Sequence, residues 1–226
     1  MDYLKRLPDD CSIVGELTRP AFSRVAEALE SRDNTVRLLR DGTENYPRWL
    51  EAIRAARRHV HLENYILKAD GAGQEFADAL IDAARRGVSC RILYDWLGCL
   101  ARTPRRFWQG LREAGIDVRC YNPPRLSSPL GWISRDHRKV LCVDGEIGFT
   151  GGLCIAQDWI GRPDRNVAPW RDTAIEVRGT AVAHLEQSFA DSWQTAGAPL
   201  PDAELAASSA RRDGTGLILG VIPGRP

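Results

Sequence analysis

The chain has 226 residues, which is enough to bury a substantial core and corresponds to about one domain of roughly 150 to 200 residues. Its 31 basic and 30 acidic side chains leave a formal net charge of +1, so an overall positive field that would gather nucleic acid is excluded, while a local basic patch is not. No stretch reaches the ~18 apolar residues of a membrane span, and the first residues lack the apolar core of a signal peptide, so we expect a cytoplasmic protein.

Strand and helix patterns alternate along most of the chain. Residues 1–34 contain one helical pattern, with Pro20 near its first turn, and are expected to form a packing arm. Beyond this arm, the strands up to residue 121 are predicted at 35–40, 59–67, 88–94 and 116–121, and the helices at 46–58, 74–86 and 104–114. This alternation predicts an α/β fold, in which helices cover both faces of a mainly parallel mixed sheet.

The strand predicted at 59–67 has a polar face. Every second side chain along it is polar or aromatic: His59, His61, Glu63 and Tyr65. A polar face on an interior strand indicates a functional site, and the alternative is a strand at an edge or on a partly wet sheet face. His59 and His61 could ligate a metal, but two ligands are too few, so no metal site is expected.

A hairpin is predicted at 139–150, because the apolar run 139–143 is closed by an Asp-Gly turn and followed by a second strand. Side chains alternate along a strand, so His137 and Lys139 point the same way and Asp144 has the other parity. An imidazole and an ammonium therefore meet at one place. By its parity, Asp144 is expected to anchor the hairpin rather than contact a substrate.

Gly151 and Gly152 follow the second strand of this hairpin. Without Cβ atoms, they let backbone N–H groups approach a ligand closely. Together with His137 and Lys139, they predict an anion site with a nucleophile. Asp95 is a further candidate, since it follows the strand at 88–94, at the carboxyl end where open α/β sheets place ligands.

The remainder of the chain holds a strand predicted at 172–177, a helix at 180–193 and a last apolar strand at 217–222. Residues 197–215 are polar, small and proline-bearing, which is typical of a linker. The six cysteines are dispersed without a C-x-x-C pair, so small buried thiols are expected rather than disulfides or a zinc site.

The spacing His-x-Lys-x4-Asp-x6-Gly-Gly resembles the HKD motif of the phospholipase D superfamily. Its five positions are His137, Lys139, Asp144, Gly151 and Gly152. The resemblance extends from Val36 to Trp193, which is similar to the first half of a bacterial cardiolipin synthase of the type without membrane-spanning helices. Its landmarks are Arg40-Asp41-Gly42, Glu63-Asn64-Tyr65, Tyr94-Asp95, Trp170-Arg171-Asp172 and the helix end from Phe189 to Trp193.

This resemblance implies a phospholipase D-like lobe and a role for each site residue. His137 would attack phosphorus to form a phosphohistidine, and Asp172, or else Glu63, would hold the other imidazole nitrogen. The remaining implied positions are Lys139, Gly151, Gly152 and Cys154 for phosphate binding, Asp144 within the catalytic motif, and Tyr65 beside Glu63 behind the site. The family places Asn where this chain has Cys154, so one amide is lost from the expected phosphate contacts. The family's chemistry needs no metal or other cofactor.

The resemblance also implies a reaction, in which two phosphatidylglycerol molecules give cardiolipin and glycerol at the inner face of the cell membrane. The protein would be peripheral to that membrane, with a phospholipid and no nucleic acid as its partner. Apolar residues in the loop 122–136 suit acyl chains or a bilayer surface, and ordinary core packing explains them equally well.

A leaving alcohol needs a general acid, which in this superfamily is the histidine of a second HKD motif. We therefore expect a second lobe in the same protein or a homodimer. The expected division of the chain is an arm at 1–34, a catalytic lobe at 35–196, a linker at 197–215 and, at 216–226, the first strand of a second lobe that this chain lacks. The alternatives are a phospholipase D-type hydrolase, a homodimeric single-motif nuclease, and an inactive lipid-binding lobe, which Cys154 favours.

Overall fold

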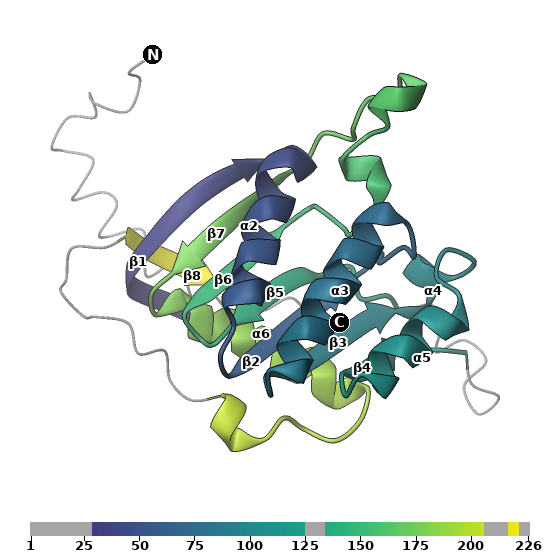
Figure 1. The fold of residues 1–226 in the computed structure, drawn as a ribbon. Coiled ribbons are helices and arrows are strands. Elements are labelled where there is room, and N and C mark those ends of the chain that lie inside the picture. Colours follow the sequence, from purple (N-terminus) through teal and green to yellow (C-terminus); the bar gives the residue numbers. More distant parts are fainter. Residues whose placement is uncertain (1–28, 125–133, 206–216, 222–226) are drawn as a thin grey trace, which may run out of the picture.

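The computed structural model describes residues 29–124, 134–205 and 217–221 (Figure 1). Its strands form one eight-stranded sheet in the order β4-β3-β2-β5-β6-β7-β1-β8. The strands are β1 (Leu29–Arg40), β2 (His59–Asn64), β3 (Ser89–Asp95), β4 (Asp117–Tyr121), β5 (Lys139–Val143), β6 (Ile147–Gly151), β7 (Thr173–Arg178) and β8 (Leu217–Val221). The helices are α2 (Asp41–Ala55), α3 (Gly71–Arg85), α4 (Trp96–Cys99), α5 (Arg105–Glu113) and α6 (Ala181–Thr195), with 3-10 turns η2 (Gln157–Trp159), η3 (Pro163–Arg165) and η4 (Asp202–Glu204).

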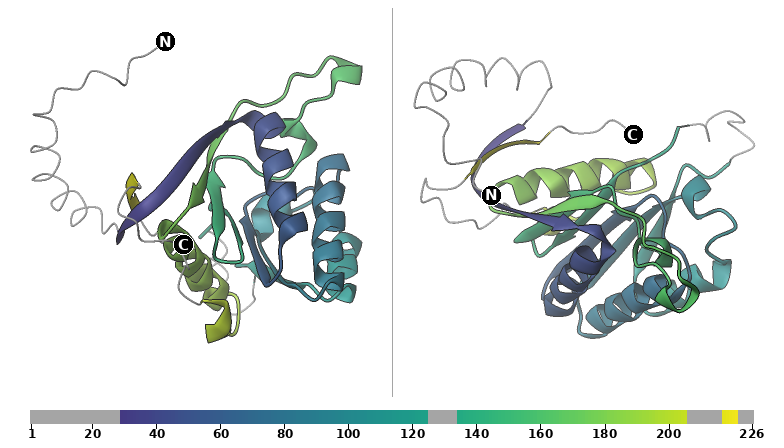
Figure 2. Two further views of the ribbon diagram at one scale, coloured as in Figure 1. Left: turned by 60° about the vertical axis from the view of Figure 1, so that its left-hand side comes forward. Right: turned by 90° about the horizontal axis from the view of Figure 1, so that it is seen from above.

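The sheet lies between two helical layers. Helices α2, α3 and α5 pack on one face, and α6 crosses the other (Figures 1 and 2). On the first face, apolar side chains of the sheet, including Phe149, meet Trp49 of α2 and Phe76 of α3 in the largest core cluster. On the second face, Phe189 and Trp193 of α6 are fully buried against the sheet. The predicted α/β fold with helices on both faces is therefore confirmed.

The sheet is mixed, as expected, but most of its pairs are antiparallel. Among the strands that the structure describes, only β2-β3 and β3-β4 pair in parallel, whereas β5, β6, β7, β1 and β8 pair antiparallel with their neighbours. The expectation of a mainly parallel sheet was wrong for a physical reason. Helix crossovers join β2, β3 and β4 in parallel, but β5 then enters antiparallel to β2, and the tight Asp144-Gly145 turn makes β6 antiparallel to β5.

The hairpin turn has the geometry that its sequence demands. Asp144 and Gly145 both adopt positive φ angles, of 57° and 68°, and the N–H of Glu146 donates to the carbonyl of Val143 at 3.0 Å. Two positive φ angles match the twist of a two-stranded ribbon, and Asp-Gly adopts them at low cost. Gly87, two residues after the end of α3, also has a positive φ, of 89°, which is typical of a glycine that ends a helix.

Strand register brings several strand ends to one edge of the sheet. Lys139 at the start of β5 pairs with Asn64 at the end of β2. Gly151 at the end of β6 pairs with Ala174 near the start of β7. The segments that carry the predicted site residues therefore meet at this edge, and the Asp144 turn lies at the opposite end of β5.

The polar face of β2 is buried rather than wet. β2 lies between β3 and β5, and His59, His61 and Glu63 are each at most 4% exposed beneath α6. The alternative of an edge strand or a wet sheet face was therefore wrong, because α6 covers these side chains.

The two ends of the chain are described only in part. β1 begins at Leu29, so the predicted helical pattern does not extend through residues 29–34, and the rest of the arm lies outside the described residues. The predicted last strand is present as β8 and pairs antiparallel with β1, which explains why β1 starts so early. The division into a lobe, a linker and the start of a second lobe stays a prediction.

The described residues also bear on the expected buried thiols and on membrane-spanning helices. Cys90, Cys99, Cys120, Cys142 and Cys154 are free thiols, and four of these are buried. Across residues 29–124, 134–205 and 217–221, no helix combines the length and the apolar character that a membrane crossing requires. The apolar loop residues at 125–133 lie outside the described residues.

Candidate active site

His137 and Lys139 meet at the glycine-bearing edge of the sheet. The Lys139 Nζ lies 3.0 Å from His137 Nδ1 and also contacts the His137 carbonyl oxygen. The Tyr65 ring packs beside both, with its centroid 4.5 Å from that of the imidazole and 5.2 Å from Nζ. The predicted convergence of an imidazole and an ammonium is thus present, and His137 is exposed while Lys139 is 4% exposed.

The environment favours a neutral imidazole. Partial burial and the positive charge of Lys139 lower the pKa of His137 below its ordinary value, against the opposing charges of Asp136 and Asp95. Burial also lowers the pKa of Lys139, although the negative charges of Asp136, Asp172 and Asp95 oppose this. A neutral imidazole keeps a lone pair with which it can act as a nucleophile.

Replacing Lys139 with Met is expected to raise the pKa of His137. The substitution removes the positive charge that disfavours the imidazolium, while the burial contribution stays. At a pH near the pKa, less of the imidazole would then be neutral. An NMR titration of the His137 ring in both proteins measures this shift, and His184 on α6 provides an internal reference that should titrate unchanged. An unchanged or lowered His137 pKa would show that the two groups do not interact as the geometry indicates.

Asp172 lies beside Gly152 at the start of β7. A Cβ on Gly152 would come within 2.1 Å of Asp172 Oδ1, so glycine is required for this approach. The carboxylate accepts hydrogen bonds from Trp159 Nε1 at 3.2 Å and from the backbone N–H of Thr173 at 2.8 Å. The charge of Asp172 also acts on Lys139. Among the described residues, the Asp172 carboxylate accepts hydrogen bonds from Trp159 and Thr173 rather than from the imidazole.

Cys154 is buried near Lys139, which lies close enough for the two groups to affect each other electrostatically. Burial raises the pKa of its thiol, so the side chain is a neutral thiol at neutral pH. The Cys154 carbonyl oxygen accepts a hydrogen bond from Tyr46 Oη at 2.6 Å. A neutral thiol supplies a weaker hydrogen-bond donor than the amide that the family places here.

Asp144 has the anchoring contacts that its parity predicts. Its carboxylate accepts hydrogen bonds from the backbone N–H groups of Arg57, Arg58 and His59 at 2.8 to 2.9 Å. These contacts tie the β5–β6 turn to the segment that leads into β2. They support an anchoring role for this member of the motif.

Glu63 and Arg138 lie on the sheet face that α6 covers. Arg138 Nε is 3.4 Å from Glu63 Oε1 and 3.3 Å from Asp136 Oδ1. Its Nη1 donates to the Ser188 hydroxyl of α6 at 3.0 Å, and its Nη2 donates to the Ser192 hydroxyl. Burial and the neighbouring Asp136 raise the pKa of Glu63 well above its ordinary value. The Glu63 carboxyl group thus belongs to an ionic cluster beneath α6.

Asp95 holds the segment that leads into His137, a role that could not be predicted from its position at the end of β3. The carboxylate is 1% exposed, and it accepts hydrogen bonds from the Asp136 N–H at 3.1 Å, from Arg135 Nη1 at 3.2 Å and from the Gly98 N–H at 2.9 Å. The pairing with Arg135 and Asp136 had no sequence signal, because it joins residues about 40 positions apart.

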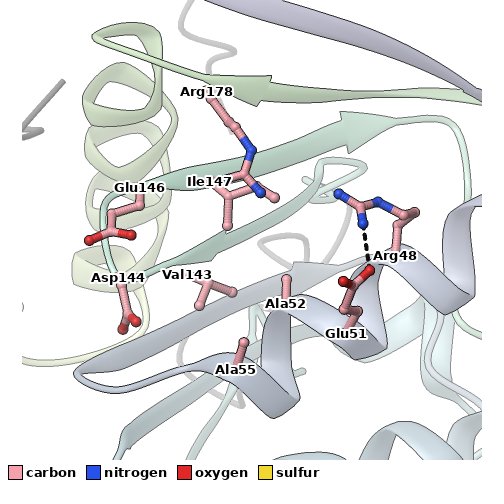
Figure 3. Close-up of a pocket in the computed structure, with 9 residues that line it drawn as sticks. All are labelled: Arg48, Glu51, Ala52, Ala55, Val143, Asp144, Glu146, Ile147 and Arg178. Atoms are coloured by element: carbon pink, nitrogen blue, oxygen red, sulfur yellow. Dashed lines mark hydrogen bonds and ion pairs between the residues drawn. The ribbon is translucent and has the colours of Figure 1, made fainter. Parts of the chain in front are cut away.

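Two cavities lie at opposite ends of strand β5. One of about 150 Å³ lies between α2 and the β5–β6 turn and includes Arg48, Asp144 and Arg178 (Figure 3). The other, of about 330 Å³, is lined by Arg40, Asp41, Arg171, Asp172 and Thr173. The second cavity opens beside Asp172, so it adjoins the candidate active site, whereas the first lies at the opposite end of β5.

Comparisons with known proteins show which family the chain is similar to. The family model described as "Cardiolipin synthase, PLD-like domain" matches residues 49–193. Cardiolipin synthase 1 of Bacillus anthracis is 40% identical over 160 residues, which cover 70% of this chain and 31% of that protein. Cardiolipin synthase A of Pseudomonas aeruginosa (strain UCBPP-PA14) is 36% identical over 187 residues, which cover 80% of this chain and 37% of that protein.

A solved structure supports the fold assignment. The crystal structure of Nuc from Salmonella typhimurium, a phospholipase D family member, has a TM-score of 0.56 at 19% identity and covers 72% of this chain and 95% of that chain. At this identity the likeness shows the fold alone. The chain spans about a third of the length of the curated relatives it matches. Since the family model covers more than half of it, the chain belongs to the phospholipase D-like domain family of cardiolipin synthases.

Proposed function

We propose that the chain is the nucleophile-bearing lobe of a cardiolipin synthase-like phosphatidyltransferase. The observation that carries the proposal is the exposed His137 imidazole, with the Lys139 ammonium 3.0 Å from Nδ1 at a glycine-bearing sheet edge. A phosphodiester repels nucleophiles because it is itself an anion. The Lys139 ammonium can offset the negative charge of the phosphodiester, and the neutral His137 imidazole can approach phosphorus without charge repulsion.

In the first step, the His137 Nε2 lone pair attacks phosphorus of phosphatidylglycerol. A P–N bond forms, the P–O bond to the glycerol headgroup breaks, and the released oxygen takes a proton from a general acid. Lys139 and the backbone N–H groups near Gly151 and Gly152 stabilise the charge on the non-bridging oxygens. In the second step, the hydroxyl of another phosphatidylglycerol gives its proton to the deprotonated general acid and attacks phosphorus, and the P–N bond breaks to release neutral His137.

In the free lobe, the His137 ring is in the tautomer that carries its proton on Nε2, which cannot attack through that nitrogen. A protonated Lys139 can only donate, so Nδ1 accepts and the neutral ring carries its proton on Nε2. Attack by Nε2 needs that proton on Nδ1 instead. A bound phosphate would draw the ammonium away from Nδ1, and Asp172 would then hold the Nδ1 proton. The position of Asp172 supports this role, since its negative charge acts on Lys139 at the same edge of the sheet.

The general acid is proposed to come from a second phospholipase D-like lobe, in the same protein or in a second copy of the chain. His59, His61 and His184 lack the motif context of His137. The relatives' greater length supports a second lobe in the same protein. Without it, this lobe would form the covalent intermediate only slowly from a natural lipid, whose glycerol leaves poorly unless it is protonated.

A membrane-facing surface is proposed beside the site. The segment between η2 and β7 projects from the sheet edge (Figure 1), and Val167 and Trp170 are 52% and 56% exposed on it. Arg162, Arg165 and Arg171 are exposed on the same segment. Aromatic and basic side chains together suit the interface of an anionic bilayer. This supports a peripheral position on the inner face of the cell membrane.

A lipid with a leaving group that departs without protonation tests the proposal on this chain alone. Phosphatidyl-p-nitrophenol should release about one nitrophenolate per chain in a burst, and mass spectrometry should find a phosphatidyl group on His137. Adding phosphatidylglycerol should discharge the intermediate to cardiolipin, while water should give phosphatidic acid more slowly. Faster discharge by water would favour the hydrolase. No burst would favour the inactive lobe, and a burst from a p-nitrophenyl nucleotide ester alone would favour the nuclease.

A further inference from the structure

A second cluster of titratable groups lies beneath α6, apart from His137. His59 and His61 project from β2, and Glu186 projects from α6 toward them. One ligand atom of each lies within 4.8 Å of the other two. The three side chains are 5%, 0% and 2% exposed. The proposed phosphatidyl transfer uses none of them.

The hydrogen bonds around His61 fix its tautomer. Nε2 lies 3.1 Å from Glu204 Oε2, and Arg91 binds both oxygens of that carboxylate, at 2.6 and 2.7 Å. The Arg91 guanidinium donates to both oxygens of Glu204, so this carboxylate acts as an acceptor, and His61 Nε2 carries the proton and donates. The lone pair of the neutral ring is then on Nδ1.

This lone pair faces a second acceptor. Nδ1 of His61 is 3.9 Å from Glu186 Oε1, and no donor among the described residues reaches it. Phe189 stacks on the ring face at 4.8 Å, which leaves the lone pair in the ring plane open toward Glu186. Two acceptors that face each other in a buried site repel unless a cation lies between them.

We propose that His59, His61 and Glu186 bind one divalent cation of the zinc class. Two imidazole nitrogens and a carboxylate oxygen are ligands that Zn²⁺ takes at about 2.0 to 2.2 Å. The three ligand atoms lie within 4.8 Å of one another, and the stacked His59 and His61 rings, with centroids 4.5 Å apart, would turn toward the ion to reach such distances. Glu204 then acts as the carboxylate that orients a ligating histidine through its other ring nitrogen. The bound ion would join β2 to α6 and hold the buried sheet face closed.

Zinc binding to the chelator-stripped 226-residue chain tests this proposal. Calorimetry and elemental analysis should find one Zn²⁺ per chain, and Zn²⁺ should raise the melting temperature. His61→Gln and Glu186→Gln should each weaken binding at least 100-fold, and Glu204→Gln about 10- to 100-fold. His184→Gln is the matched control, since His184 lies on α6 outside the cluster, and it should bind as the natural chain does.

Two results would overturn the site. One is a stripped chain that takes up no stoichiometric zinc, which would leave His59 Nε2 and Glu186 Oε1 as a hydrogen-bonded pair at 2.6 Å without a metal. The other is equal zinc affinity in folded His61→Gln and Glu186→Gln chains. Should those variants not fold, Co²⁺ in the natural chain decides. Tetrahedral d–d bands without thiolate charge transfer support the site, and thiolate bands would place the metal on cysteines instead.

Discussion

His137→Ala is expected to abolish the nitrophenolate burst and to lower the rate of phosphatidyl transfer by at least about 10³-fold. The imidazole supplies the nitrogen of the P–N bond, so the substitution removes the nucleophile. Lys139 beside it is a cation whose ammonium has no lone pair to offer. The rate is measured with the activated lipid and with phosphatidylglycerol in the presence of the second lobe.

The substitution should leave the fold intact, because His137 is exposed and its loss removes little packing. The free energy of unfolding should change by less than about 0.5 kcal/mol. His184→Ala, which removes a histidine from α6, is the matched control and should keep the burst. A His137→Ala chain that still forms a phosphatidyl-enzyme would place the nucleophile elsewhere and sink the proposed mechanism.

The hairpin and its nucleophile could be predicted because each rests on a local pattern. Strand parity placed His137 and Lys139 on one side, and the Asp144-Gly145 pair determined the turn between β5 and β6. The direction of pairing between distant strands could not be predicted in this way. β1 pairs with β7 and β8, which lie far along the chain, and local patterns contain no information on such partners.

The side-chain partners of the polar face of β2 could not be predicted either, because they too are distant in the sequence. The sequence predicted that His59 and His61 share a face, but their acidic partners follow 127 and 143 positions later, on α6 and η4. Each partner alone has no sequence signal, since an acidic residue on an amphipathic helix is ordinarily solvated. The cluster becomes visible only once α6 is placed on the sheet.

Arg138→Met is expected to destabilise the lobe by about 3 to 5 kcal/mol. Arg138 has the parity opposite to His137 and Lys139, so it points beneath α6 to the buried carboxyl groups of Glu63 and Asp136. Removing the guanidinium leaves Asp136 without its cation and the Ser188 and Ser192 hydroxyls without a donor. Chemical denaturation followed by circular dichroism measures the free energy of unfolding.

A double-mutant cycle separates this ionic effect from lost packing. Arg138→Met should cost less in an Asp136→Asn background, because the carboxylate 3.3 Å from the guanidinium is then replaced by a neutral amide. Arg106→Met, an exposed arginine on α5, is the matched control and should cost less than about 0.5 kcal/mol. Equal costs in both backgrounds would mean that Arg138 stabilises α6 through packing alone.

Below its melting temperature, the Arg138→Met chain should still form the His137 intermediate. Arg138 contacts groups beneath α6, whereas His137 and Lys139 lie at the open sheet edge. The substitution should therefore lower the stability of the lobe and leave the chemistry at His137 in place.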